Sequence, residues 1–217
     1  FSQQKKIKFD ADLQFADEEK YPGATVLIGK VKMFHAGAVL TSKKAFYYKE
    51  DNFFKAIGDV VINQGDTIKQ YSDYVDYDAN TKKTVSWGHV ILKDPTMTLT
   101  SDTLYFNRGS QLLFYKDYAV IKDETNVLES KFGNYYLEQK KFVATTKVTI
   151  TNPDNLIESN HLDYYTNSGH AFLYGPSTIT NQKDNNKIYS ERGFYNTKTD
   201  ISHFVKNAKL YLDERTI

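Results

Sequence analysis

Hydrophobic and polar residues alternate with a period of two along most of the chain. Segments such as "GHVILKD", "MTLTSDTLYF" and "QLLFYKDYAVI" show this alternation, which places successive side chains on opposite faces of a β-strand. Polar clusters such as "KEDN", "DANTKK", "NRGS" and "EQKK" separate these segments and are typical of hairpin turns. No segment sustains the i, i+3, i+4, i+7 stripe of an amphipathic helix. The pattern predicts an all-β protein with essentially no helix.

The alternating segments belong to a repeat of about 30 residues. Its anchor is a serine that recurs at spacings of 30, 29, 29, 29 and 31 residues. The anchor serines are Ser42, Ser72, Ser101, Ser130, Ser159 and Ser190. Five positions after each serine lies an aromatic residue: Tyr47, Tyr77, Phe106, Tyr135, Tyr164 and Tyr195. Eleven positions before each serine lies an apolar residue: Val31, Val61, Val90, Ala119, Val148 and Ile179.

The apolar positions around each serine predict that the strand bends there. Leu99 lies two residues before Ser101, whereas Leu104 and Phe106 lie three and five residues after it. In an unbroken strand Leu99 and Leu104 would point to opposite faces. Both can face one interior only if a bulge shifts the strand by one residue. The serine hydroxyl can then bond the backbone groups that the bend releases.

A stack of such bent strands would enclose a long apolar interior. We therefore expect an elongated, open β-jellyroll of stacked, bent antiparallel strands, with residues 1–217 forming a single domain of about six repeats. The chain begins with "FSQQKK", as after removal of a leader, and ends in "YLDERTI" directly after a strand pattern, so we expect the parent protein to be longer.

Composition and motifs narrow the possible functions. The chain has 28 Lys and Arg residues and 27 Asp and Glu residues, which gives a net charge of +1. It therefore lacks the excess of positive charge that is typical of nucleic-acid-binding proteins. The absence of cysteine excludes disulfides, thiolate metal sites and a cysteine nucleophile. No apolar run reaches the ~18 residues of a transmembrane helix. The five histidines lack metal-ligand spacing, and no GxSxG, P-loop or GxGxxG motif occurs. We expect no enzymatic activity, no metal and no cofactor.

The repeated pattern G-x-V…S-D-x-L-x-Y/F resembles the OstA/LptA repeat of lipopolysaccharide-transport proteins. The segments "GDVVINQGDTIKQYSDYVDYDANTKK", "GHVILKDPTMTLTSDTLYF" and "FLYGPSTI" carry the resemblance, which spans about residues 5–212. Four repeats depart from it, because Lys43, Lys131, Asn160 and Glu191 stand where the pattern has aspartate.

The resemblance implies a location and a set of partners. Members of this family are periplasmic or associated with the outer membrane, and their jellyrolls shield the acyl chains of lipopolysaccharide. They join end to end with homologous jellyroll domains through their terminal strands. We therefore expect export to the periplasm and binding of lipopolysaccharide or a similar amphipathic lipid. The strands expected to join such domains are residues 5–15 and 205–213.

The expected lipid-facing residues are those at the repeated apolar offsets. They are Val61, Val90, Leu99, Leu104, Phe106, Leu128, Tyr135, Val148, Ile157, Leu162 and Tyr164. The same side chains would also form the core of any jellyroll, and the small residues Ala45, Ala119, Gly133 and Gly193 either leave room for a ligand or relieve crowding between strands. Two alternatives therefore stay open at the level of sequence. One is a scaffold of an outer-membrane assembly that holds no lipid, and the other is a carbohydrate-binding or hydrolytic domain.

Overall fold

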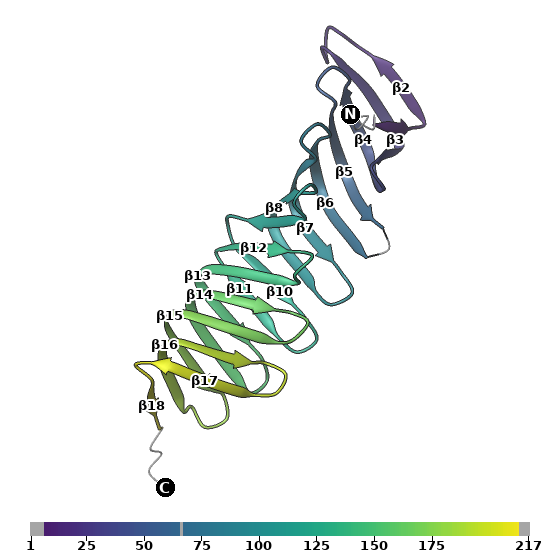
Figure 1. Cartoon of the computed structure of the whole chain (residues 1–217). Helices are drawn as coiled ribbons and strands as arrows, with labels where there is room; N and C mark the ends of the chain where they lie inside the picture. The colour runs from purple at the N-terminus through teal and green to yellow at the C-terminus, as the bar shows by residue number, and fades with distance from the viewer. Residues whose placement is uncertain (1–6, 66, 213–217) are drawn as a thin grey trace. The chain divides into compact units, whose positions relative to one another are not determined.

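The computed structural model describes residues 7–65 and 67–212. All regular secondary structure within these ranges is β-strand (Figure 1). The predicted all-β fold is confirmed. The described residues form two compact units. Unit 1 comprises the residues up to Pro95 together with Thr100–Leu112, and unit 2 comprises Thr96–Leu99 together with the residues from Leu113 onward. That residues 1–217 act as one domain stays a prediction.

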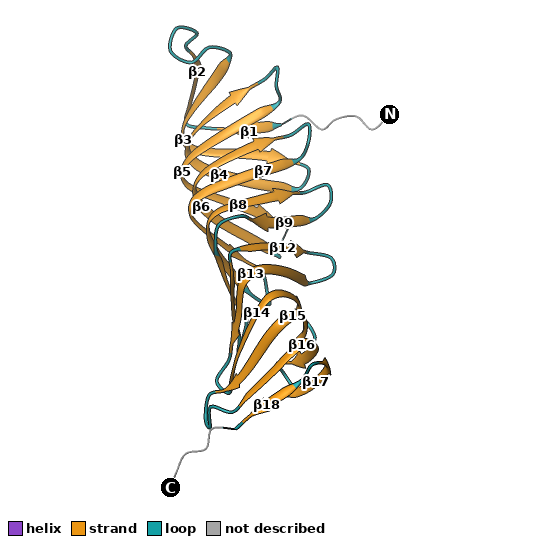
Figure 2. Cartoon of the chain, turned by 90° about the vertical axis from the view of Figure 1, so that its left-hand side faces the viewer, coloured by secondary structure: helices purple, strands orange, loops and turns teal. Residues whose placement is uncertain are grey.

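The strands of unit 1 follow one another as antiparallel neighbours from β2 to β7, and β1 also pairs with β3. Figure 2 shows them lying side by side. The strands are β1 (Lys8–Asp10), β2 (Leu13–Ala16), β3 (Ala24–His35), β4 (Ala38–Tyr48), β5 (Phe53–Gln64), β6 (Ile68–Asp78), β7 (Lys83–Lys93) and β8 (Thr98–Asn107), whose first two residues belong to unit 2.

Unit 2 repeats the same arrangement. Strands β13 to β16 pair in sequence order, β11 and β12 both pair with β13, and β17 and β18 both pair with β16. The strands are β9 (Leu112–Tyr115), whose first residue belongs to unit 1, β10 (Ala119–Lys122), β11 (Val127–Ser130), β12 (Phe132–Tyr136), β13 (Lys141–Thr151), β14 (Asn155–Tyr165), β15 (His170–Asn181), β16 (Lys187–Asn196), β17 (Ile201–Lys206) and β18 (Lys209–Tyr211).

The long strands bend at β-bulges, as the parity of the apolar positions predicts. The register between β3 and β4 shifts between Ile28 and Val31, and equivalent shifts interrupt β5–β6, β13–β14 and β15–β16. At the first of these, Gly29 and Lys30 have φ of 77° and 45°. This left-handed conformation strains most side chains, which explains the glycine of the G-x-V motif.

The anchor serines bond the backbone beside the bend. Ser42 Oγ donates to the carbonyl of Lys44 at 3.0 Å. Ser101, Ser130, Ser159 and Ser190 bond the carbonyl two residues ahead in the same way, at 2.8–3.2 Å. The predicted hydroxyl–backbone contact is thus confirmed in five repeats. In the sixth, Ser72 Oγ has no hydrogen-bond partner among the described residues.

The bend divides each long strand into two arms, and the arms form two facing walls. In unit 1, wall A contains residues 31–35, 38–42, 60–64, 68–72 and 90–93, and wall B contains 24–28, 44–48, 53–57, 74–78, 83–87 and 103–107. In unit 2, wall A contains 119–122, 127–130, 148–151, 155–159, 177–181, 187–190 and 209–211, and wall B contains 113–115, 132–136, 141–145, 161–165, 170–174, 192–196 and 201–206. One buried cluster of unit 1 joins Met33 and Leu40 of wall A to Phe54 and Val75 of wall B. The core therefore lies between the walls.

Candidate functional site: the interior between the walls

The expected lipid-facing residues lie in this interior, with one exception. Ten of the eleven are at most 9% exposed: Val90, Leu99, Leu104, Phe106, Leu128, Tyr135, Val148, Ile157, Leu162 and Tyr164. The exception is Val61, which is half-buried and pairs with Tyr71. Its neighbour Val60 pairs with Ser72 and is 1% exposed. The Ser42–Ser72 repeat is one residue longer than the three that follow, and this shifts the interior position from Val61 to Val60.

Aromatic rings fill much of the interior. In unit 1 the ring of Tyr47 lies 5.1 Å from that of Phe9 and 6.5 Å from that of Phe54. In unit 2 the rings of Tyr135 and Phe142 stack at 4.1 Å, and both side chains are at most 1% exposed. These ring contacts are of the kind found in packed protein cores.

Two of the small residues of the interior, Gly133 and Gly193, are covered by neighbouring rings. A Cβ atom on Gly133 would lie within 2.3 Å of the Tyr115 ring, and the Tyr115 hydroxyl bonds Ser130 Oγ at 2.6 Å. A Cβ atom on Gly193 would lie 2.6 Å from the Phe204 ring. The space that these glycines leave is therefore occupied by the chain's own aromatic side chains.

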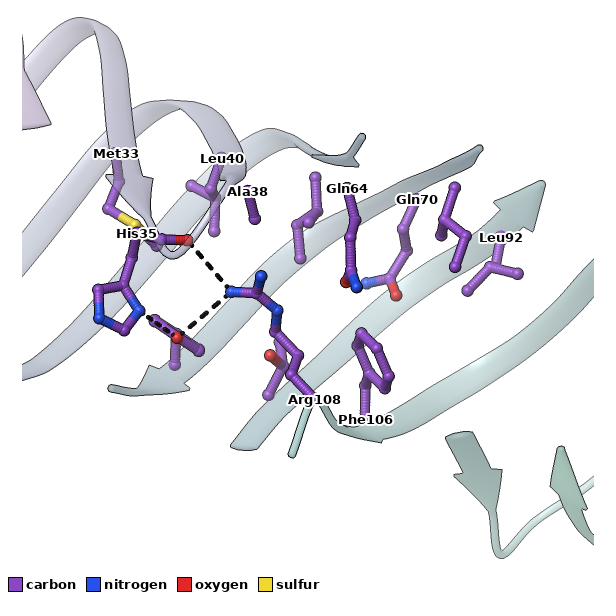
Figure 3. Close-up of a pocket in the computed structure, with 13 residues that line it drawn as sticks. Met33, His35, Ala38, Leu40, Gln64, Gln70, Leu92, Phe106 and Arg108 are labelled. Atoms are coloured by element: carbon purple, nitrogen blue, oxygen red, sulfur yellow. Dashed lines mark hydrogen bonds between the residues drawn. The ribbon is translucent and has the colours of Figure 1, made fainter. Parts of the chain in front are cut away.

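Unit 1 retains a cavity of about 30 Å³ near the free ends of its walls (Figure 3). Met33, Leu40 and Leu92 line it from wall A, and Phe106 lines it from wall B. A space of this size admits water-sized molecules and is far too small for an acyl chain. The cavity marks a gap in the packing and not a ready lipid site.

Polar groups bridge the walls beside this cavity. Figure 3 shows His35, at the free end of wall A, facing Arg108, which directly follows wall B. Arg108 donates from Nη1 to the carbonyl of His35 at 3.2 Å and from Nη2 to that of Ala36 at 3.0 Å. His35 Nδ1 lies 2.5 Å from the hydroxyl of Tyr77. Burial raises the pKa of Tyr77, and the nearby Arg108 opposes this shift.

Two similar bridges occur in unit 2. The Tyr164 hydroxyl donates to Asp123 Oδ2 at 2.5 Å and accepts a bond from Asn126 Nδ2 at 3.2 Å. The Tyr195 hydroxyl accepts a bond from Asn155 Nδ2 at 2.9 Å. The sequence does not indicate these bridges, because the turns that contain Arg108 and Asp123 have the composition of ordinary solvated turns.

Because two buried tyrosines have raised pKa values, we expect the folded protein to lose stability at high pH. Burial raises the pKa of Tyr115 to about 12, and burial together with Asp200 raises that of Tyr195 to about 12. An unfolded tyrosine ionises near pH 10. These two groups therefore stabilise the fold fully below about pH 10, and the contribution is lost as the pH rises toward about 12. We expect urea midpoints to fall over this window, and to fall less steeply in a Tyr115→Phe variant. Equal slopes for both proteins would contradict the assignment.

The outer faces carry aromatic contacts, such as the Tyr74 ring stacked on Trp87 at 5.4 Å and the Phe172 ring 5.8 Å from that of Phe194. Within the described ranges no group of three or more His, Asp or Glu side chains could hold a metal ion. None of the described residues belongs to a helix long and apolar enough to span a membrane. His89 and Asp73 form an exposed pair at 2.7 Å. The interior, by contrast, is lined by buried residues at equivalent positions of successive repeats.

The terminal strands expose apolar side chains. Leu13 of β2 is 52% exposed, and Leu210 and Tyr211 of β18 are 63% and 53% exposed. Leu13 lies in the segment 5–15 and β18 lies in the segment 205–213, the two segments expected to join other domains. Residues 5, 6 and 213 of those segments are outside the described residues.

Comparison with known families gives a match over residues 4–160, to the family described as OstA-like protein. The chain belongs to the OstA-like protein family. From the sequence, the resemblance was expected to reach about residue 212, whereas the family match ends at residue 160. Repeats anchored by the same serine hydrogen bond nevertheless continue to Ser190. No curated protein matches this OstA-like chain.

Among solved structures, the OstA-like chain is similar to LptH from Pseudomonas aeruginosa. LptH is described as the LptA homologous periplasmic component of the conserved lipopolysaccharide transport device. The two are 16% identical, the similarity covers 46% of this chain and 75% of LptH, and the TM-score is 0.42.

Proposed function

We propose that this OstA-like protein is a non-enzymatic, periplasmic component of lipopolysaccharide transport that shields acyl chains between its walls. The observation that carries the proposal is an apolar interior that successive repeats of an OstA-like chain line with residues at equivalent positions. Shielding an acyl chain from water contributes roughly 25 cal/mol per Å² of apolar surface. Because each repeat adds a similar stretch of apolar wall, a trough of several repeats can shield a long acyl chain along its length.

The proposed lipid contacts are the interior residues of wall A and wall B. Leu104 and Phe106 are the leading positions in unit 1, because Phe106 lines the cavity and Leu104 lies two residues before it on the same face. In the closed conformation only about 30 Å³ is free there, so an acyl chain enters only when the walls separate.

We propose that the terminal strands join this protein to similar jellyroll domains. An exposed strand edge offers unpaired backbone groups to an incoming strand. The exposed Leu13 on β2 and Leu210 on β18 would be covered by such a neighbour. The strand addition would extend the interior from one domain to the next and locate the protein in a bridge that reaches the outer membrane.

Photo-crosslinking tests the lipid proposal. A photoreactive amino acid at Leu104 or Phe106 should capture lipopolysaccharide, detected as a mass shift that reacts with a lipopolysaccharide antibody. The same group at Tyr105, which lies between them and points to the other face, is the matched control. Capture at Tyr105 alone, or at none of the three, would refute the proposal.

A scaffold that holds no lipid is the second candidate. The rings of Tyr115 and Phe204, which occupy the space beside Gly133 and Gly193, favour it. A scaffold would show strand-mediated joining with no crosslink at any interior position.

A further inference from the structure

We propose that each unit carries hydrogen-bonded latches between the free ends of its walls, and that these latches set how often the interior opens. We define the arginine latch of unit 1 as His35, Tyr77 and Arg108 with the Ala36 carbonyl. The two tyrosine latches of unit 2 are Tyr164 with Asp123 and Asn126, and Tyr195 with Asn155 and Asp200. The use of the opening to admit an acyl chain rests on the proposed function, whereas the latches themselves do not.

The latches occupy the position where the walls could part. Opposite each latch, at the bend, the walls are joined by continuous backbone. The free ends are turns, and the latches connect a turn or strand end of wall A to one of wall B. In unit 1 the connection runs from residues 35–36 to Arg108, which are 72 or 73 positions apart in sequence. Breaking it leaves the backbone ladders intact.

The tyrosine latches reuse the aromatic position of the repeat. Tyr164 and Tyr195 are 1% and 3% exposed, so their rings pack in the core while their hydroxyls reach the opposite wall. Asn126 Nδ2 also donates to Thr197 Oγ1 at 3.3 Å, and Asn155 Nδ2 donates to Asp200 Oδ1 at 2.9 Å. Each tyrosine latch therefore contains more than one hydrogen bond between the walls.

Unpaired polar atoms lie at the latches and favour reversible opening. Five buried side-chain atoms have no hydrogen-bond partner among the described residues, and Arg108 Nε and Asn126 Oδ1 are two of them. A third, Gln64 Oε1, belongs to a residue that lines the cavity with Arg108 (Figure 3). Buried groups without a partner destabilise the state that buries them. When the walls separate, water can bond these atoms. The free energy gained in this way offsets part of the free energy lost when the latch hydrogen bonds break.

A single buried cysteine can measure the opening directly. The chain has no cysteine, and Ala144 is a small, fully buried residue of wall B in unit 2. The rate at which a small maleimide modifies an Ala144→Cys variant reports how often the interior becomes accessible. We expect Tyr164→Phe and Tyr195→Phe each to raise this rate roughly three- to tenfold, and the double variant to raise it further.

The matched control removes a hydroxyl away from the latches. Tyr174 lies on the outer face of β15 and is 36% exposed, so Tyr174→Phe should leave the rate unchanged. Labelling should depend only weakly on urea, because wall separation exposes less surface than global unfolding. Unchanged rates in both latch variants, or a urea slope equal to that of global unfolding, would overturn the latch proposal.

Added lipopolysaccharide separates this inference from the proposed function. If the latch variants accelerate labelling but lipopolysaccharide never slows it, the latches stand and the lipid proposal fails. If lipopolysaccharide slows labelling while the latch variants have no effect, the latch proposal is overturned and the lipid proposal stands.

Discussion

Replacing Phe142 with alanine is expected to lower the free energy of unfolding by about 3–5 kcal/mol. Phe142 is fully buried, stacks on Tyr135 at 4.1 Å and pairs across the sheet with Tyr164. The substitution removes apolar contacts and leaves a cavity that the surrounding β-ladders hold open. Urea unfolding followed by circular dichroism measures the loss.

Phe172 provides the control for this prediction. It lies on the neighbouring part of wall B in β15 but on the outer face, where it is 37% exposed. Phe172→Ala should cost clearly less stability than Phe142→Ala. Similar losses for the two variants would mean that the core does not lie between the walls.

Gly133→Ala is expected to destabilise the protein by about 1–3 kcal/mol, although it adds a single methyl group. The new Cβ would lie within 2.3 Å of the Tyr115 ring, which is 2% exposed and bonded to Ser130. The ring must move, and the hydroxyl contact is strained or lost. Gly109→Ala is the control, because its nearest neighbour is a side-chain oxygen of Asn107 at 3.2 Å in an exposed turn.

A double-mutant cycle identifies Tyr115 as the obstacle. Tyr115→Leu removes the ring that the methyl group meets, so Gly133→Ala should be less harmful in that background than in the wild type. An additive pair would show that the ring does not occupy this space. The result also bears on function, because a ring held over Gly133 leaves no room there for a lipid.

The bends and the walls could be predicted from sequence because they follow from local parity. In an unbroken strand Leu99 and Leu104 would lie on opposite faces, and the structure buries both side chains, at 0% and 1% exposure. The hydrogen bond of the anchor serine could be predicted in the same way, because a short hydroxyl side chain at a bend can donate to the nearest free carbonyl. One added residue in the Ser42–Ser72 repeat was enough to move the interior position from Val61 to Val60.

The latches and the filled interior could not be predicted from sequence. Arg108 lies in an "NRGS" turn, and its partners His35 and Ala36 are more than two repeats away. No local pattern connects them. The glycine at position 133 likewise indicates only that a neighbouring group needs space there. It does not reveal that the group is the ring of Tyr115, which comes from another strand.

Quenching of an interior tryptophan tests the central claim most directly. Trp87 is the chain's single tryptophan, and it stacks on the exposed Tyr74 on the outer face. Phe106→Trp in a Trp87→Phe background moves this reporter into the interior. Amphiphiles brominated on their acyl chains should quench the fluorescence of the interior reporter saturably and leave native Trp87 unaffected. Quenching of Trp87 alone, or of neither reporter, would contradict the account of an interior that opens to receive acyl chains.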